Sequence, residues 1–119
     1  MANPFVHLEL NSTDPQKSKD FYGKLFDWKM EDMQMPVGTY TMIDVGTGTG
    51  GGIMKQLMPD TGSLWLAYAE VDDIGKATKK AESLGAQVMK DSVEVPNMGW
   101  FSIIVDPTGA LLGLWQTKR

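Results

Sequence analysis

Two side chains near the amino terminus have the types and spacing that acid–base or metal chemistry requires. His7 is the only histidine among 119 residues, and Glu9 follows it two positions later. The stretch is apolar at alternate positions, as a half-buried strand is, so both side chains are expected on the same strand face. An imidazole and a carboxylate side by side can exchange a proton near neutral pH or give two ligands to a divalent ion. A purely structural hydrogen-bonded role for His7, and a solvated or lysine-paired Glu9, stay open alternatives.

A glycine-rich stretch offers a second kind of chemistry. "GTGTGGG" contains the spacing G-x-G-x-x-G at Gly46, Gly48 and Gly51. In a dinucleotide site, such glycines precede a helix whose amino end holds the phosphates. Here only "IMKQLM" lies between Gly52 and a predicted turn over 59–62, too short for a crossover helix. The stretch is therefore interpreted as a hairpin turn leading into a strand.

The overall charge argues against nucleic acid as a partner. The chain has 11 Lys and Arg against 15 Asp and Glu, a net charge of −4, and its single arginine is Arg119. Phosphate binding depends on clustered basic side chains. The sequence has no cysteine, which excludes disulfides, thiolate zinc sites and cysteine nucleophiles. No targeting segment and no apolar run of about 20 residues is visible, so we expect a cytoplasmic protein with no membrane partner.

Periodicity predicts the same order of elements twice. The first half contains a strand at the start, a helix opened by Asp14 and Pro15, and three more strands, the first two joined near Pro36 to Gly38. The second half repeats this order with a helix capped by Asp72 or Asp73. The expected strands are 5–11, 28–35, 38–45, 51–56, 64–71, 86–95, 100–105 and 110–116, and the second helix is expected over 72–85.

The two halves also align residue by residue. One separation of 61 residues pairs Gly38 with Gly99, Tyr40 with Phe101, Gly48 with Gly109 and Gly52 with Gly113. We therefore predict an α+β protein, a single domain over 1–119 built from two tandem βαβββ modules at about 4–57 and 63–117.

Three segments resemble a known superfamily. "HLELNSTDPQKSKDFYGKLFDWKM", "AEVDDIGKATKKAESLGAQV" and "GWFSIIVDPTGALLGLWQ" are similar to the vicinal oxygen chelate proteins, which include glyoxalase, bleomycin-resistance and extradiol-dioxygenase proteins. The chain looks most like their small glyoxalase-like members. The resemblance implies a mixed sheet that curls around a cavity, and assembly as a homodimer.

The resemblance also implies where a metal ion would bind. Members with an ion carry His on the first strand of a module and Glu on the last strand after the D-P-x-G turn. Only His7 matches a ligand position, because the other three positions hold Leu66, Gly52 and Gly113. A catalytic divalent site needs about three protein ligands and an open position.

Other carboxylates could still complete a divalent site. Glu9 would be the second ligand, and Glu70 or Asp44 the third. We expect no metal or other cofactor, and a divalent ion is the alternative.

The strand alternation predicts which side chains line a ligand cavity. Catalytic roles are assigned to His7 and Glu9. Ligand contacts are expected from His7, Glu9, Met54, Leu66, Tyr68 and Trp115. Trp100 is added to this set, although the alternation does not determine on which face of its strand it lies. Apolar and aromatic walls with a few polar groups are typical of small-molecule pockets.

Three functions are compatible with these residues. The first is metal-free binding of a small apolar or aromatic molecule. The negative net charge of the chain would favour a cationic molecule of this kind. The second is a lyase or isomerase of the glyoxalase type, with His7 and Glu9 as metal ligands or as a metal-independent acid/base pair. The third is an interaction module with a vestigial cavity. Whether the chain catalyses a reaction is left open by the residues.

Overall fold

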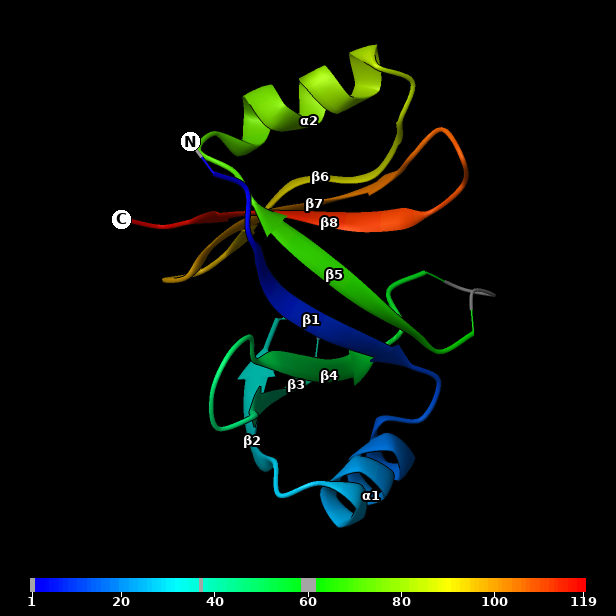
Figure 1. The fold of residues 1–119 in the computed structure, drawn as a ribbon, viewed down its shortest axis with the longest axis vertical. Coiled ribbons are helices and arrows are strands. Elements are labelled where there is room, and N and C mark those ends of the chain that lie inside the picture. Colours follow the sequence, from blue (N-terminus) through cyan, green and yellow to red (C-terminus); the bar gives the residue numbers. More distant parts are fainter. Residues whose placement is uncertain (1, 37, 59–61) are drawn as a thin grey trace. The chain divides into compact units, whose positions relative to one another are not determined.

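The structure, a computed structural model, describes residues 2–36, 38–58 and 62–119. The predicted α+β order is confirmed, with strand, helix and three strands occurring twice (Figure 1). The predicted turns at Pro36 to Gly38 and at 59–62 fall partly outside the described residues. The elements are β1 (Phe5–Ser12), α1 (Pro15–Leu25), β2 (Lys29–Met35), β3 (Gly38–Asp44), β4 (Gly51–Lys55), β5 (Leu64–Glu70), α2 (Ile74–Ser83), β6 (Gln87–Val95), β7 (Gly99–Val105) and β8 (Leu111–Thr117).

Contacts divide the chain into two compact units. The first-half unit contains His7–Leu66, and the second-half unit contains Ala67–Arg119 together with the residues up to Val6. Each helix is short, and no described helix combines the length and apolarity needed to span a bilayer.

The first-half unit is a four-stranded sheet in the order β2, β3, β4, β1. Its β2–β3 and β3–β4 pairs are antiparallel, whereas β1 and β4 run parallel. Leu10, Ile43 and Ile53 form its buried core, against which Tyr22 and Trp28 pack. The alternate residues of the same strands point to the opposite face of the sheet, which carries the candidate site.

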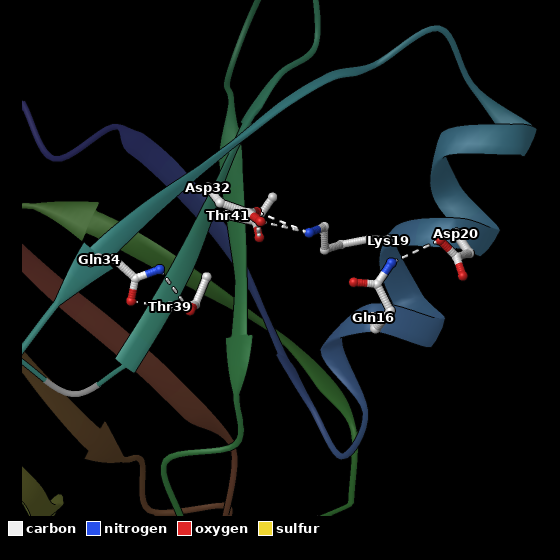
Figure 2. A network of polar contacts seen from close by, with 7 residues as sticks. All are labelled: Gln16, Lys19, Asp20, Asp32, Gln34, Thr39 and Thr41. Atoms are coloured by element: carbon white, nitrogen blue, oxygen red, sulfur yellow. Dashed lines mark hydrogen bonds and ion pairs between the residues drawn. The ribbon is translucent and has the colours of Figure 1, made fainter.

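The helix α1 is held by polar contacts as well as by aromatic packing. Asp14 caps it by accepting the Lys17 amide at 3.1 Å. Figure 2 shows the Lys19 ammonium reaching from α1 to Asp32 on β2, with 3.0 Å to each carboxylate oxygen. Thr41 on β3 donates its hydroxyl to the same carboxylate at 2.6 Å. Lys19 therefore fastens the helix to β2, and Thr41 joins the same carboxylate to β3.

The second-half unit repeats this plan. Its strand order is β5, β8, β7, β6, with β5 and β8 parallel and the other pairs antiparallel. The helix α2 lies over β6, β7 and β8 (Figure 1). Its Ile74 packs with Ile104 and Leu114 in the core of this unit. Asp73 accepts the Lys76 amide at 3.0 Å, so Asp73, and not Asp72, is the cap.

Candidate functional site

The strand register places His7 and Glu9 on one face of the first-half sheet. Glu9 on β1 is opposite Gly52 on β4, and Gly52 is opposite Met42 on β3. Paired residues share a face, and so do residues two positions away along each strand. This face therefore carries His7, Glu9, Asn11, Tyr40, Met42, Gly52 and Met54.

Four of these side chains form a hydrogen-bonded cluster, which we name the polar centre: His7, Glu9, Asn11 and Tyr40. The Tyr40 hydroxyl lies 2.6 Å from His7 Nε2 and donates to Glu9 Oε2 at 2.9 Å. Asn11 Nδ2 donates to the other oxygen, Glu9 Oε1, at 2.9 Å. Glu9 and Asn11 are buried, with 6% and 2% of their surface exposed. The predicted neighbours His7 and Glu9 are thus joined through a phenol.

The hydrogen bonds restrict where protons can lie. A hydroxyl has a single proton, and that of Tyr40 is donated to Glu9. The hydroxyl oxygen must then accept from His7, so in this arrangement Nε2 carries the imidazole proton. Burial lowers the pKa of His7 below its ordinary value, and the Glu9 carboxylate opposes this in part. Burial therefore favours the neutral form of the His7 imidazole near neutral pH.

A glycine makes this arrangement sterically feasible. The Tyr40 ring lies over Gly52, where a Cβ would overlap the ring atoms Cε1, Cζ and Oη. The strand β4 lies between β3 and β1, so the phenol crosses a whole strand to reach Glu9. A side chain at position 52 would block this path.

The second-half unit has a similar glycine but different chemistry. Tyr68 on β5 is directly opposite Gly113 on β8, and its ring covers that glycine. Phe101 packs edge-on against Tyr68 with ring centroids 6.3 Å apart. Trp115 is opposite Phe101 and donates from Nε1 to Thr117 at 3.0 Å. The predicted contacts Tyr68 and Trp115 therefore share an aromatic face.

Trp100 lies on the other face of that sheet. It is opposite Gln116 and packs with the core under α2. Its neighbours Phe101 and Trp115 point the opposite way. Trp100 borders a separate hollow of about 250 Å³, lined by Val71, Asp72, Trp100, Gln116, Thr117 and Arg119. The sequence alternation did not determine which sheet face carries Trp100. In the structure it lies on the face opposite to that of Tyr68 and Trp115.

The residues present do not fit a divalent ion. Both oxygens of Glu9 accept hydrogen bonds, and His7 Nε2 is engaged by Tyr40. The Tyr40 ring occupies the space over Gly52 where a carboxylate would project.

The further carboxylates considered from the sequence have their own contacts. Asp44 accepts the Gly46 amide at 2.9 Å, and Glu70 accepts from Thr117 at 3.3 Å. Across residues 2–36, 38–58 and 62–119, no three His, Asp or Glu side chains gather in a way that could hold an ion. The donor set therefore falls short of the three ligands that such a site needs.

Two predicted contacts are buried apolar residues of the first-half unit. Leu66 is 1% exposed and Met54 is 6% exposed. Met54 shares the face of the polar centre by register, two residues after Gly52. Tyr40 was not predicted as a site residue. The sequence repeat aligned Tyr40 with Phe101 but gave it no role. Only the strand order, with β4 between β3 and β1, shows that the Tyr40 ring reaches Glu9.

The class of protein follows from a family match over most of the chain. Residues 5–114 match the family described as the Glyoxalase/Bleomycin resistance protein/Dioxygenase superfamily. The chain belongs to this superfamily, as its sequence resemblance implied.

Curated relatives are about twice as long as this chain. It is 33% identical over 118 residues to the glyoxylase-like protein CFP32 of Mycobacterium tuberculosis, covering 94% of this chain and 45% of the relative. It is 29% identical to the anthracycline biosynthesis protein DnrV of Streptomyces peucetius, covering 92% and 45%. The chain spans about half the length of the curated relatives it matches.

Solved structures share the fold. A hypothetical protein from Bacillus halodurans C-125 superposes with a TM-score of 0.75 at 15% identity, covering 100% of this chain and 97% of that one. Methylmalonyl-CoA epimerase from Mycobacterium tuberculosis gives 0.70 at 12% identity, covering 97% and 88%. At these identities the likeness concerns the fold alone.

Proposed function

We propose that this chain binds a small organic molecule at the polar centre and does so without a resident divalent ion. The observation that carries this proposal is the Tyr40 hydroxyl, which bridges His7 and Glu9 at 2.6 and 2.9 Å. Burying an imidazole, a carboxylate and an amide costs free energy that hydrogen bonds only offset. Their concentration on one face supports a role in recognising a polar group.

The rest of that face supports an apolar or aromatic ligand body. Met42 and Met54 share it by register, and so does Met33, which is opposite Tyr40 on β2. Methionine side chains are flexible and make favourable contacts with aromatic rings. The carboxylate of Glu9 favours a ligand with a hydrogen-bond donor or a positive charge. The relative named for anthracycline biosynthesis also supports a small molecule as the ligand.

Calorimetry tests this function directly. An anthracycline and a panel of aromatic amines are titrated into the protein with and without EDTA. We expect binding of at least one compound to be unchanged by EDTA and weakened about tenfold or more in Glu9→Gln, since a charged hydrogen bond contributes about 1.5–3 kcal/mol. Lys118→Gln, which loses an exposed ion pair to Glu94, is the control and should bind normally. Binding that EDTA abolishes would count against the proposal.

A metal-independent lyase or isomerase is the second candidate. The continuous chain from His7 through Tyr40 to Glu9 favours it. A neutral His7 can take a proton from a carbon next to a carbonyl, and the electron pair of that C–H bond then forms an enolate. The carboxylate of Glu9, acting through Tyr40, stabilises the imidazolium. In a ketone with a hydroxyl on the carbon that lost its proton, the hydroxyl proton moves to the enolate oxygen. The proton held by His7 then returns to the former carbonyl carbon, and this completes an isomerisation.

Proton exchange tests the second candidate. Ketones with a hydroxyl on the neighbouring carbon are incubated in D₂O with EDTA, and loss of the C–H signal is followed by ¹H NMR. Exchange above the buffer rate that disappears in His7→Gln is expected. Exchange no faster than in buffer, across the panel, contradicts this candidate.

Association of two chains is a further proposal, supported by the resemblance. Several large apolar side chains of the first-half unit are exposed, including Phe21 at 58% and Leu25 at 56%. Size-exclusion chromatography with light scattering is expected to give twice the mass of one chain. If the chain is instead an interaction module with a vestigial cavity, no compound will bind and the mass will rise only with another protein.

A further inference from the structure

We infer that Tyr40 and Gly52 form a mutually dependent pair that closes the divalent-ion position of the superfamily beside His7. In this inference, which rests on the proposed function, the Tyr40 hydroxyl takes the place that an ion would occupy. The ion is then excluded because the Tyr40 ring fills the space that a side chain at Gly52 would occupy.

The register explains why the two residues depend on each other. Gly52 is opposite Glu9 on one side and Met42 on the other. Tyr40 lies two residues before Met42, so its side chain emerges on the same face one strand away. Neighbouring strands are about 4.8 Å apart, and the hydroxyl must cross β4 to lie 2.9 Å from Glu9 Oε2. It can do so only where β4 has no side chain.

The same position explains why an ion is excluded. The resemblance assigns residue 52 to the carboxylate ligand, and here its side-chain space is filled by the ring. The nitrogen of His7 that the ring approaches, Nε2, is bonded to the hydroxyl at 2.6 Å. Glu9 is held from both oxygens by Tyr40 and Asn11. An incoming ion would have to displace the Tyr40 hydroxyl from His7 Nε2 and from Glu9 and would still lack a third strong ligand.

The second-half unit provides a matched comparison. Gly113 occupies the position that corresponds to Gly52, and the Tyr68 ring covers it. The position that corresponds to Tyr40 is Phe101, which has no hydroxyl, and the position that corresponds to His7 is Leu66. Closure by an aromatic ring thus occurs in both halves, but only the first half has an imidazole that could bind an ion.

Cobalt titration tests the inference. Co²⁺ is added to the wild type and to Tyr40→Ala/Gly52→Glu, which removes the ring and restores the carboxylate beside His7 and Glu9. The double variant is expected to bind one Co²⁺ at least about tenfold more tightly than the wild type and to lose this binding when His7→Ala is added. The visible absorption of Co²⁺ reports the coordination.

The matched control is Tyr68→Ala/Gly113→Glu, which makes the same change in the second-half unit, whose own residues include no histidine. It is expected to bind Co²⁺ no more tightly than the wild type. The inference is overturned if the wild type binds one Co²⁺ through His7, or if the first-half double variant folds but gains no affinity over this control.

A second measurement remains informative if Glu at position 52 prevents folding. Gly52→Ala is compared in the wild type and in Tyr40→Ala by thermal unfolding. The loss in Tm is expected to be at least about twofold smaller without the ring, because the added methyl then meets no obstacle. Since the chain has one histidine, the imidazole Cε1–H resonance in ¹H NMR is assigned without ambiguity and should shift alike in Gly52→Ala and Tyr40→Ala. Equal Tm losses in both backgrounds would overturn the mutual dependence.

These outcomes are separate from those of the proposed function. Metal affinity and Tm coupling are measured without any organic ligand. A protein that binds no compound can therefore still show the coupled pair, and one that binds a compound can fail the cobalt test.

Discussion

At the scale of single residues, one hydroxyl organises the candidate site. The sequence predicted that His7 and Glu9 share a face, and the structure places them so, yet they are joined through Tyr40. Alternation along β1 predicts neighbours within a strand. It cannot predict a side chain that crosses from a strand two places away, because that depends on sheet order and on the missing side chain at Gly52.

The first prediction concerns that hydroxyl. Tyr40→Phe keeps the ring over Gly52 but removes the donor to Glu9 and the contact with His7. We expect the free energy of unfolding to fall by about 1–3 kcal/mol, since a buried carboxylate oxygen loses a donor. Urea denaturation measures this loss. Tyr22→Phe is the control, because its hydroxyl accepts a 3.3 Å exposed bond from Trp65, and it should change stability by less than about 0.5 kcal/mol.

The second prediction concerns pH. Burial lowers the pKa of His7 below 6.5, with Glu9 opposing. The unfolded chain therefore binds more protons than the folded one between the folded pKa and 6.5. The free energy of unfolding is then highest above this window and falls as pH decreases through it. His7→Gln should show a weaker fall in urea denaturation between about pH 7 and pH 5. A steeper fall in the variant would be the opposite of what the burial of His7 requires.

At the scale of elements, the helices and strands follow local signals closely. Asp14 and Pro15 begin α1 as expected, and the strands fall within a few residues of their predicted ranges. The choice between Asp72 and Asp73 as the cap of α2 could not be made from the sequence. Either acid can precede a first turn, and only backbone geometry decides which one faces the amide of Lys76.

The third prediction uses this pair of acids. Asp73→Ala removes the acceptor of the Lys76 amide and should lower the free energy of unfolding by about 1 kcal/mol, as loss of an N-cap does. Asp72→Ala changes the same charge one residue earlier without touching the cap. Its effect should stay within about 0.5 kcal/mol. Equal losses in both variants would assign the effect to charge and not to the cap.

At the scale of the whole molecule, one duplicated plan carries different side chains in its two halves. The constant separation of 61 residues predicted the duplication, and both units show the same strand order. The sequence also showed that only one half holds a histidine. It did not show that tyrosine rings cover both Gly52 and Gly113, the positions that the resemblance assigns to carboxylate ligands. The reason is that Tyr40 lies on the third strand of its module, whereas Tyr68 lies on the first strand of its own.

The fourth prediction follows from the difference in burial of these two rings. Tyr68 is 4% exposed, so a methyl added in Gly113→Ala meets a ring that cannot swing away. The free energy of unfolding should fall by about 1–3 kcal/mol, as overpacking of a core does. Tyr40 is only half-buried, so in Gly52→Ala it can turn outward. That variant should lose less stability than Gly113→Ala and yet lose the contact of the hydroxyl with His7.

Gly23→Ala supplies the control for both substitutions. Gly23 lies within α1, and a Cβ built there meets no atom within 4 Å. Alanine should therefore stabilise the chain by about 0.5–1 kcal/mol through helix propensity. Urea denaturation of the three variants, with the His7 resonance followed by NMR, separates packing from chemistry. If Gly52→Ala lost as much stability as Gly113→Ala and left the His7 resonance unmoved, Tyr40 would be a packing residue like Tyr68, and the two halves would differ less than their chemistry indicates.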